Sequence, residues 1–216
     1  MVEKKDINAG ASGGNHGLLH SGARYIASDP IAAKECRQES DLLKKLAPHC
    51  IEDTGGLFVA VEGDDERYLA SFEDRCAQCG ILTEPIDVQN ALEKEPNLSG
   101  EIIAAFRVPD ATIDPFKLSL DNIAHAQMLG SKLLRFTQVT GFDISGSTIK
   151  RVRLRSHETG KDFFITARVV VNASGAWAGE IAALAGATIG VVYSKGSLLV
   201  TQERVSRRVI NRLRLA

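Results

Sequence analysis

The segment with the most chemically capable side chains is residues 17–25, which read GLLHSGARY. It places an imidazole at His20 and a guanidinium at Arg24 a few residues apart, followed by a phenol at Tyr25. Gly22 lies between them, and a residue without a side chain lets a ligand approach the backbone closely. The planar fork of arginine matches a carboxylate or a phosphate. The segment therefore predicts a site for an anionic ligand, with a turn that only displays polar side chains as the alternative.

A glycine-rich loop precedes this segment. Residues 9–17 read AGASGGNHG, and such a loop can offer backbone N–H groups to a pyrophosphate. Glu3 stands before the loop, where the acidic residue of a dinucleotide fold accepts hydrogen bonds from a ribose. The G-x-G-x-x-G turn that normally stands about 20 residues before that acid is absent from the sequence. The loop and the glutamate are therefore weak signals when taken singly, and a surface glutamate is the alternative.

A third segment, residues 169–177, reads VVVNASGAW. Its apolar start is typical of a short strand buried on both faces, and a helix is expected to follow from Ala176 to Ala185. The small residues between strand and helix allow a flat cofactor to approach the backbone closely. The alternative is a tight corner that binds nothing.

Two of the cysteines, Cys76 and Cys79, form a C-x-x-C pair, a spacing found in redox-active sites and in zinc sites. Both continue an apolar stripe at helical spacing that includes Tyr68 and Phe72, and Gly80 is placed to end that helix. The sequence has no second C-x-x-C and no suitably spaced histidine pair to complete a metal site. We therefore predict that these cysteines are buried, unbridged and free of metal.

The elements that must position these segments alternate between helix and strand. Two Asp-Pro pairs, at Asp29 and Asp114, predict helix starts with aspartate as the N-cap and proline in the first turn. The apolar residues expected on the buried sides of these helices are Leu42, Leu43, Leu46 and Ala47 in the first and Phe116, Leu120, Ile123, Ala124 and Met128 in the second. Strands are expected at residues 55–61, 104–108 and 132–136. One antiparallel hairpin is expected, formed by residues 149–155 and 162–166. This order predicts a mixed α/β fold.

The composition excludes some functional classes. The 216 residues carry a net charge of −1, so the basic surface of a nucleic-acid-binding protein is not expected. The one basic cluster, residues 204–214, is expected to be a solvated helix face. No stretch approaches the roughly 20 apolar residues of a membrane span, and residues 1–8 carry charges where a signal peptide needs an apolar run. Four cysteines in a chain of this length suggest a reducing, cytoplasmic setting.

Taken in order, these segments resemble the FAD-dependent glycerol-3-phosphate dehydrogenases of the anaerobic large-subunit type, in the glycine oxidase/D-amino-acid oxidase superfamily. Residues 108–118, VPDATIDPFKL, and residues 195–199, KGSLL, extend the resemblance over essentially the whole chain. Some relatives have a histidine directly after the K-G-S triplet. This chain has Leu198 there, as the anaerobic type does. The resemblance implies an α/β fold with a partial FAD-binding Rossmann-like lobe and a partial substrate lobe built on an antiparallel sheet.

The resemblance also implies domain bounds. Residues 1–50 and 116–185 would form the FAD-binding lobe without its first strand and helix, and residues 51–115 and 186–216 would form the substrate-domain portion. The chain would then be an internal piece of a longer protein, lacking the N-terminal G-x-G-x-x-G segment and the C-terminal part. Because a glycine turn and a helix N-terminus normally bind the pyrophosphate, FAD binding by the chain alone is expected to be weak or absent.

Individual residues acquire roles from the same resemblance. The residues that would contact FAD are Glu3 and Lys4 at the ribose, Val139 at the adenine, Ser12, Gly13, Asn15 and His16 at the pyrophosphate and flavin, His20 and Gly22 beside the isoalloxazine ring, and Ala173 and Gly175 closing over the cofactor. Catalytic roles are implied for His20, for Arg24, which would reach the substrate, and for Lys195, near the substrate side of the flavin with Ser197. No residue is expected to bind a metal.

In the full-length protein, the resemblance implies oxidation of sn-glycerol 3-phosphate to dihydroxyacetone phosphate, with a hydride passing from C2 to flavin N5. Electrons would reach a quinone pool through other subunits of a membrane-associated complex, with this protein cytoplasmic or peripheral on the cytoplasmic face. Two alternatives stay open. Arg24 could equally hold a carboxylate, as in a 2-hydroxy-acid or amino-acid dehydrogenase or oxidase of the same superfamily, or the chain could be a folded but inactive fragment.

Overall fold

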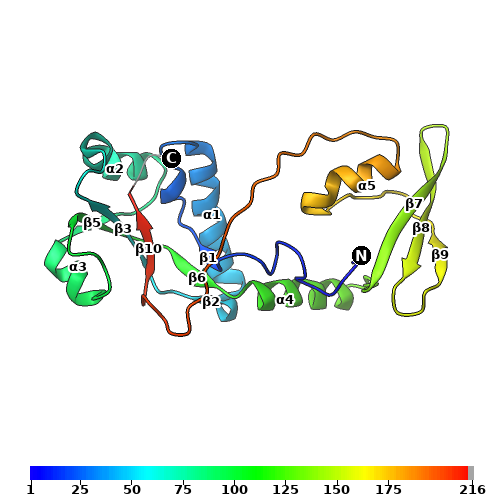
Figure 1. Cartoon of the computed structure of the whole chain (residues 1–216), viewed down its shortest axis with the longest axis horizontal. Coiled ribbons are helices and arrows are strands. Elements are labelled where there is room, and N and C mark those ends of the chain that lie inside the picture. The colour runs from blue at the N-terminus through cyan, green and yellow to red at the C-terminus, as the bar shows by residue number, and fades with distance from the viewer. Residues whose placement is uncertain (214–216) are drawn as a thin grey trace. The chain divides into compact units, whose positions relative to one another are not determined.

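The computed structural model describes residues 1–213, which form two compact units (Figure 1). The first unit comprises Met1–Asn15 and Ser119–Leu198, and the second comprises His16–Leu118 and the residues from Leu199 onward. These bounds differ from the predicted lobes, because residues 16–50 group with the segment that follows them. The roles of the two lobes in binding FAD and substrate therefore remain predictions. Residues 214–216, the end of the predicted substrate portion, lie outside the described residues.

The second unit contains a mixed four-stranded sheet. Its strands are β3 (Gly56–Val61), β4 (Glu84–Ile86), β5 (Ile102–Val108) and β10 (Val209–Arg212). They lie in the order β10-β3-β5-β4, with β10 parallel to β3 and the other pairs antiparallel. The strands predicted at residues 55–61 and 104–108 are confirmed as β3 and β5. A smaller antiparallel sheet has the order β1-β6-β2 and consists of β1 (Leu18–Leu19), β6 (Ala111–Ile113) and β2 (Ile51–Glu52).

The helices of the second unit are α1 (Pro30–Leu46), α2 (Glu66–Gln78) and α3 (Val88–Lys94), with single 3-10 turns η1 (Ala23–Tyr25) and η2 (Pro48–Cys50). Helix α1 begins at the predicted Asp29 cap, and α2 and α3 also follow aspartates, Asp65 and Asp87. The Asp29 carboxylate accepts a hydrogen bond from the Ala32 N–H at the start of α1 (3.0 Å). Gly80 ends α2 with a φ of 73°, a conformation that glycine adopts without strain. Both predicted signals are confirmed.

Strand β3 is buried on both faces, as its continuous apolar sequence GLFVAV indicates. On one face, Phe58 packs against Phe72 of α2, with ring centroids 5.2 Å apart. On the other face, Leu57 belongs to a second cluster with Ala91 of α3. Because successive side chains of a strand point to opposite sides, this one strand contributes to both halves of the core.

The buried side of α1 differs from the prediction. Leu42 and Leu46 are 45% and 70% exposed, whereas Ala33 is fully buried and Ala47, just after the helix, is buried as predicted. The helix approaches the turn at Gly22 so closely that a Cβ there would lie 2.1 Å from the Ala33 carbonyl oxygen. The contact between α1 and the turn is thus made by the small residues Gly22 and Ala33. Hydrophobic periodicity predicts instead that the larger leucines form the buried side of the helix.

Helix α4 (Pro115–Met128) begins at the predicted cap, where the Asp114 carboxylate accepts hydrogen bonds from the N–H groups of Phe116 and Lys117. Its predicted buried face is wrong. Phe116 and Met128 are 51% and 85% exposed, and no residue of the helix is buried within the described part of the chain. Periodicity identified the helix, but a stripe is buried only where a neighbouring element covers it.

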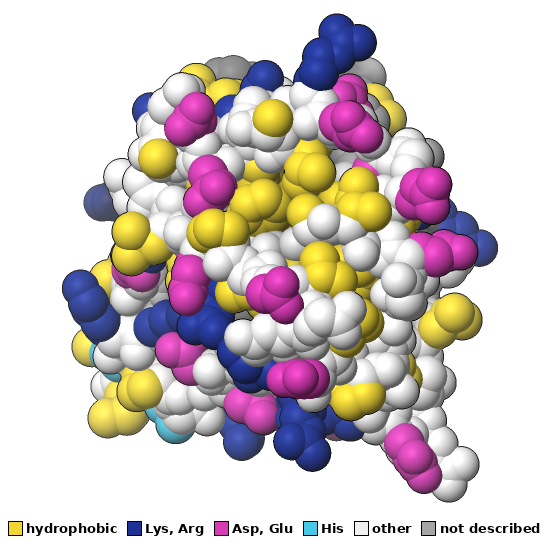
Figure 2. Space-filling view, turned by 90° about the vertical axis from the view of Figure 1, so that its left-hand side faces the viewer, with side chains coloured by type: hydrophobic (Ala, Val, Ile, Leu, Met, Phe, Trp, Pro, Cys, Tyr) yellow, Lys and Arg dark blue, Asp and Glu magenta, His cyan; other side chains and the backbone are white. Residues whose placement is uncertain are grey.

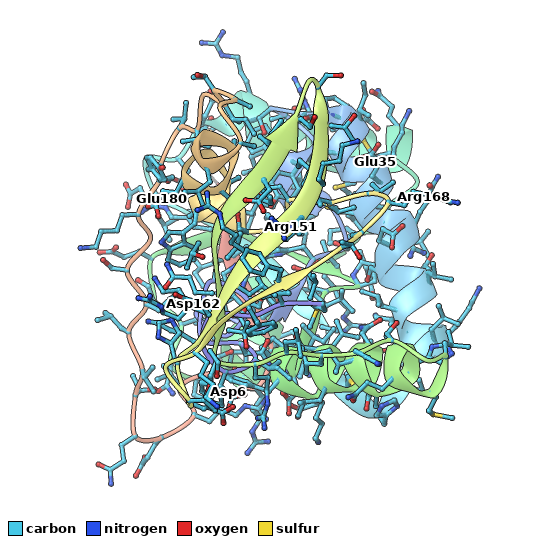
Figure 3. All side chains as sticks on the ribbon, turned by 90° about the vertical axis from the view of Figure 1, so that its right-hand side faces the viewer. Asp6, Glu35, Arg151, Asp162, Arg168 and Glu180 are labelled. Carbon is cyan, nitrogen blue, oxygen red and sulfur yellow. The ribbon has the colours of Figure 1, made fainter. Side chains whose placement is uncertain are left out.

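The first unit holds an antiparallel sheet in the order β7-β8-β9, formed by β7 (Thr137–Ser145), β8 (Thr148–Ser156) and β9 (Asp162–Ile165). The β8–β9 pair confirms the predicted hairpin. Val152 and Leu154 of β8 are buried, while Arg151 extends to Asp143 (2.7 Å) on the exposed side. Figure 3 shows Arg151 and Asp162 on these strands. The turn η3 (Gly175–Trp177) and helix α5 (Ala178–Leu184) follow, near the predicted helix.

Two predicted strands of the first unit are not formed. Residues 132–136 contribute only one parallel bridge, between Val2 and Leu134. Residues 169–171 are not a strand, and Val169 and Val171 are 71% and 81% exposed. An apolar run becomes a buried strand only where another strand pairs with it, and none within residues 1–213 pairs with this segment.

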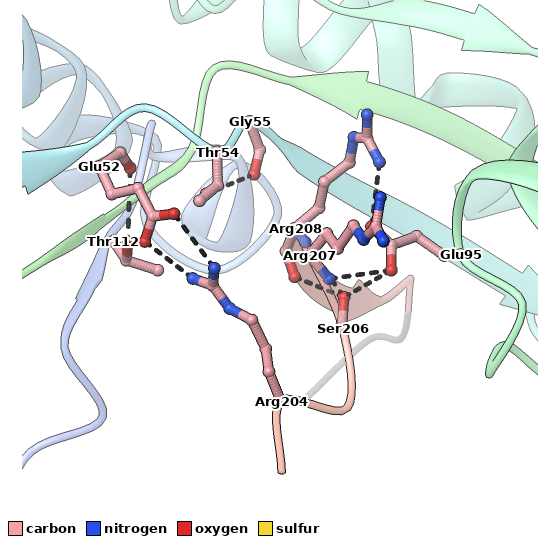
Figure 4. A network of polar contacts seen from close by, with 9 residues as sticks. All are labelled: Glu52, Thr54, Gly55, Glu95, Thr112, Arg204, Ser206, Arg207 and Arg208. Atoms are coloured by element: carbon pink, nitrogen blue, oxygen red, sulfur yellow. Dashed lines mark hydrogen bonds and ion pairs between the residues drawn. The ribbon is translucent and has the colours of Figure 1, made fainter.

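The basic segment at residues 204–214 is not a helix face, which corrects the prediction for its described part. It leads into β10, where Val209 and Ile210 pair with β3. Its arginines bind carboxylates: Arg204 lies 2.8 Å from Glu52, and Arg208 lies 3.0 Å from the buried Glu95 (Figure 4). These ion pairs anchor the segment, so the cluster is structural rather than an open basic surface.

Charged side chains of both signs surround a central group of hydrophobic side chains on the face of the second unit drawn in Figure 2. This mixture agrees with the net charge of −1. Among residues 1–213, none of the helices has the length and apolar character needed to cross a bilayer.

Candidate functional site

Backbone pairing places His20 directly opposite an acid, Asp110. Strands β1 and β6 are antiparallel with Leu19 opposite Ala111, so the residue after β1 faces the residue before β6. The His20 Nδ1 atom lies 3.5 Å from the Asp110 carboxylate, and their side chains are only 11% and 1% exposed. The Ser21 N–H donates a hydrogen bond to the same carboxylate (2.7 Å). The predicted catalytic histidine therefore has a buried acidic neighbour that the sequence analysis did not identify.

Asp110 is held from several segments of the second unit. The side-chain amide of Asn211, on β10, donates a hydrogen bond to Asp110 Oδ2 (3.1 Å). The backbone at Gly56 packs so closely that a Cβ there would lie 2.7 Å from Asp110 Cβ. The carboxylate consequently has little freedom to move away from His20.

The electrostatics keep this acid ionised. Burial raises the pKa of the Asp110 carboxyl, but contacts with His20 and Ser21 outweigh that effect and lower the pKa below its ordinary value. The His20 Nδ1 atom and the Ser21 hydroxyl contribute through proximity only, because neither forms a hydrogen bond of good geometry within the described structure. Asp110 is therefore a buried anion at neutral pH, with His20 as its ionisable partner.

His16 lies on the other side of His20. Their rings meet edge to face with centroids 5.4 Å apart. Partial burial lowers the pKa of His16, and the nearby His20 and Arg24 lower it further. The structure thus brings together His16, His20 and Arg24, three of the predicted site residues, and adds Asp110.

Arg24 is the exposed cation of this group. It lies in η1, whose first turn is closed by the Tyr25 N–H donating to the Gly22 carbonyl (2.9 Å). No carboxylate among residues 1–213 forms an ion pair with Arg24, including the carboxylates of α1, where Asp41 pairs with Arg37 instead. An exposed guanidinium without an internal partner is available to an anionic ligand. Position 22 requires glycine for structural reasons as well, because its φ is 98° and α1 approaches its backbone too closely for a side chain.

The predicted nucleotide-binding residues of the first unit gather around its N-terminal segment. The Glu3 N–H donates to the Leu134 carbonyl and the Glu3 carbonyl accepts from the Thr137 N–H, both at 2.9 Å. Val2 shares a hydrophobic cluster with Val139, the residue predicted to contact adenine. Glu3 and Val139 therefore lie on neighbouring segments, while the side chain of Lys4 is exposed.

The glycine-rich loop uses its own donors internally. The N–H groups of Gly13 and Gly14 both donate to the Gly10 carbonyl (3.2 Å), and the Asn15 side chain donates to the Ser12 carbonyl (2.6 Å). These groups form a closed turn rather than a row of free donors. The N–H groups of Gly13 and Gly14 are therefore not free to bind a pyrophosphate in this conformation.

The corner at residues 172–177 lies beside this loop. A Cβ at Gly10 would lie 3.5 Å from the ring of Trp177. Two residues predicted to close over the cofactor, Ala173 and Gly175, are exposed there, and Gly175 has a φ of 55°. The loop and the corner, which are far apart in sequence, are thus neighbours within the first unit.

Lys195, the third predicted catalytic residue, lies on an exposed segment of the first unit without regular secondary structure, as does Ser197. It forms no hydrogen bond or ion pair with any residue in the range 1–213. Its predicted catalytic role stays a prediction.

Both cysteines of the C-x-x-C pair are buried and unbridged, as predicted, and Cys36 and Cys50 are unbridged as well. Burial, together with the neighbouring Cys79, Asp110 and Glu73, raises the pKa of the Cys76 thiol to about 12. A thiol in that state is almost fully protonated at neutral pH and reacts slowly, because the thiolate is the nucleophile. The absence of bound metal stays a prediction.

We expect Cys76 to react at least about 100-fold more slowly with iodoacetamide at pH 8 than the half-buried Cys36, because few molecules carry the Cys76 thiolate. Mass spectrometry of the native 216-residue chain after timed labelling measures this ratio. Denatured protein is the control and should label both cysteines at similar rates. Comparable native rates, or near-stoichiometric zinc or iron in metal analysis, would contradict the prediction of inert core cysteines.

Asp110 carried a weak signal in the sequence. It follows a strand of apolar residues and precedes a second short strand, within residues 108–118 that contributed to the resemblance. The pairing of β1 with β6, which gives the acid its neighbour, joins segments 89 residues apart at the Ser21–Asp110 contact. Local sequence patterns carry no information about such a pairing.

Comparison with known proteins gives a consistent result. The sequence matches the protein family FAD dependent oxidoreductase over residues 1–214. It is 44% identical over 214 residues to a subunit of the anaerobic glycerol-3-phosphate dehydrogenase of Escherichia coli, covering 99% of this chain and 40% of that protein. The anaerobic glycerol-3-phosphate dehydrogenase subunit of Haloferax volcanii is 39% identical over 224 residues, covering 99% and 38%. The chain thus spans about 40% of the length of the curated relatives it matches.

A solved structure agrees with these sequence matches. The crystal structure of L-proline dehydrogenase from P. horikoshii superposes with a TM-score of 0.71 and 28% identity, over 85% of this chain and 48% of that one. The mixed α/β fold predicted from the sequence is therefore confirmed.

Proposed function

The chain belongs to the FAD dependent oxidoreductase family, and from that membership we propose that the protein oxidises sn-glycerol 3-phosphate to dihydroxyacetone phosphate. Relatives with up to 44% identity carry the name of that dehydrogenase, which supports this substrate. FAD, when bound, supplies the acceptor for the hydride that leaves C2 of the substrate. The residues of this chain would bind the phosphate, orient the alcohol and take its proton.

The observation that carries the proposal is the state of Arg24. Its guanidinium is exposed, has no carboxylate partner within residues 1–213, and lies four positions after His20. A guanidinium can hold a phosphate through two parallel charge-assisted hydrogen bonds. One end of a small phosphorylated alcohol held at Arg24 would leave its hydroxyl group near the imidazole of His20.

His20 suits the role of proton acceptor. Its side chain is mostly buried, with Nδ1 facing the Asp110 carboxylate, so Nε2 is the ring atom left to face a substrate. The oxidation of an alcohol releases one proton from the hydroxyl group as the hydride leaves carbon. His20 would accept that proton.

The residues of the first unit fit part of FAD. The Glu3 carboxylate would accept hydrogen bonds from ribose hydroxyl groups, and one of its oxygens already accepts from the Lys5 N–H (2.9 Å). Val139 lies on a neighbouring segment, and Ala173 and Gly175 are exposed beside the glycine-rich loop. Fewer donors in the loop would face the pyrophosphate, because the N–H groups of Gly13 and Gly14 are already bonded to the Gly10 carbonyl.

We therefore expect the 216-residue chain to bind free FAD weakly or not at all. The shortage of free N–H donors for the pyrophosphate limits the affinity for FAD, since a ribose contact alone contributes little. Quenching of flavin fluorescence during a titration measures the dissociation constant, and Glu3→Gln should change it little. Saturable binding at micromolar or tighter affinity would show that the loop opens to receive the phosphates and would refute this expectation.

We further propose that electrons leave the protein through other subunits to a quinone pool. The support is that the relatives are named as subunits of the dehydrogenase, which implies companion subunits in those proteins. A cytoplasmic location, peripheral on the membrane within such a complex, follows from the same proposal.

A chimera tests the substrate. This chain would replace the matched segment of the Escherichia coli relative, which supplies the remaining 60% of the length. FAD-dependent reduction of a dye by sn-glycerol 3-phosphate is expected, with little or none by L-proline, glycine or lactate. Glycerol without phosphate is the matched control for the anion contact. Faster turnover with an amino or hydroxy acid would favour the second candidate, an oxidoreductase of carboxylate substrates, which the likeness to L-proline dehydrogenase supports.

A further inference from the structure

We propose that Asp110 is a positioning residue for His20, holding its neutral imidazole in the tautomer that carries the proton on Nδ1. This leaves the lone pair of Nε2 to accept the proton of the substrate hydroxyl group. The inference deepens the proposed function and rests on it for the identity of the substrate, but the tautomer itself can be measured without any substrate.

Geometry aims the carboxylate at one nitrogen of the ring. The opposed ends of β1 and β6 put Nδ1 of His20, and not Nε2, 3.5 Å from Asp110 Oδ2. That distance is longer than the roughly 2.7–3.2 Å of a good N–H···O hydrogen bond, so a small rotation of the ring would complete the bond. Even at 3.5 Å, a bare Nδ1 lone pair facing a buried carboxylate is repulsive, whereas an Nδ1–H group is attracted.

A purely structural role does not account for a charged residue at this position. The carboxylate accepts hydrogen bonds from the Ser21 N–H and from the Asn211 amide, and a neutral asparagine could accept from a backbone N–H without the cost of burying a charge. No lysine or arginine within residues 1–213 forms an ion pair with Asp110. Of the ionisable side chains beside it in that range, the Cys76 thiol stays protonated, and only His20 can become cationic and gain from the charge.

In the proposed step, the proton of the substrate hydroxyl group moves to His20. The O–H bond at C2 of the substrate breaks and an N–H bond forms at His20 Nε2. The electron pair left on oxygen becomes the second bond of the new carbonyl as the hydride leaves C2 for FAD, the oxidant of the family. His20 then carries a proton on both nitrogens, and the Asp110 carboxylate stabilises that cation.

Nitrogen-15 NMR of the histidine rings in the full 216-residue chain tests the proposal. At pH about 9 a histidine is neutral, and the two ring nitrogens report which of them carries the proton. His20→Gln identifies the signals of His20 among the five histidines. We expect the proton on Nδ1 in the native chain. Asp110→Asn keeps an oxygen for the Ser21 N–H but turns an amide donor toward Nδ1, so the proton should move to Nε2.

Asn211→Ala is the matched control. It removes a hydrogen bond from the same carboxylate oxygen but leaves the charge facing His20, so the proton should stay on Nδ1. A proton on Nε2 in the native chain, or an unchanged tautomer in Asp110→Asn, would overturn the proposal. If Asp110→Asn does not fold, the native chain and Asn211→Ala still decide it. A correct tautomer in a chimera that does not oxidise sn-glycerol 3-phosphate would refute the proposed function and leave the positioning role intact.

Discussion

Replacing Arg24 with alanine in the chimera is expected to lower kcat/KM for sn-glycerol 3-phosphate by about 2–4 kcal/mol, or roughly 30- to 1,000-fold. The guanidinium has no carboxylate partner among residues 1–213 to lose, so the loss should fall on substrate binding rather than on stability. Arg24→Lys keeps the charge but not the planar fork, and it should restore only part of the loss. Steady-state kinetics with dye reduction measure both variants.

Arg67→Ala is the control for this prediction, since Arg67 is an exposed arginine in the first turn of α2. It should leave kcat/KM unchanged. If Arg24 only braces its loop, Arg24→Ala would instead lower the melting temperature and FAD retention while leaving KM for the phosphate substrate nearly constant. An unchanged kcat/KM in Arg24→Ala would remove the main support for an anion-binding role.

Phe72→Ala is expected to reduce the free energy of unfolding of the second unit by about 3–5 kcal/mol. Phe72 is fully buried in the described structure and contacts three other aromatic rings, with centroids 5.2 Å from Phe58, 5.0 Å from Phe106 and 6.3 Å from Tyr68. Truncation removes these contacts and leaves a cavity where α2 meets the sheet. Phe72→Leu fills most of the space and should cost less.

Phe116→Ala is the matched control, because the same change is made at a phenylalanine of α4 that is 51% exposed. It should change the free energy of unfolding by less than about 1 kcal/mol. Urea denaturation followed by amide hydrogen exchange resolves the second unit from the first. Equal effects of the two alanine variants would mean that the cluster around Phe72 is not the centre of the core.

The sequence predicted local features well because their causes are local. Asp29 and Asp114 cap helices through N–H groups two or three residues away, and Gly80 ends α2 through its own backbone conformation. The alternation of Val152 and Leu154 with arginines specified the face of β8 that is buried. Each of these signals lies within a few residues of its effect.

Predictions that depend on distant neighbours were less accurate. Leu42 and Leu46 of α1 are exposed because the helix contacts the turn at Gly22 through Ala33, and hydrophobic periodicity does not predict such a contact. The valines at 169–171 form no strand without a pairing partner within the described residues. Arg204 and Arg208 are engaged by Glu52 and Glu95, which lie more than 100 residues earlier.

The candidate site was anticipated in part for the same reason. His20 and Arg24 are close in sequence, and their proximity could be read directly. Asp110 could not, since its position beside His20 depends on the pairing of two very short strands. The charge of Asp110 determines which ring nitrogen of His20 carries the proton in the proposed mechanism. The residue that the sequence patterns did not reveal is therefore central to the chemistry proposed for the site.

The most direct test of the central claim is anaerobic reduction of bound flavin in the chimera. Adding sn-glycerol 3-phosphate without any electron acceptor should bleach the flavin absorbance near 450 nm, at about one substrate per flavin. Rapid bleaching is expected with this substrate and none with glycerol or L-proline at equal concentration. Flavin that stays oxidised with sn-glycerol 3-phosphate but is bleached by an amino acid would contradict the account.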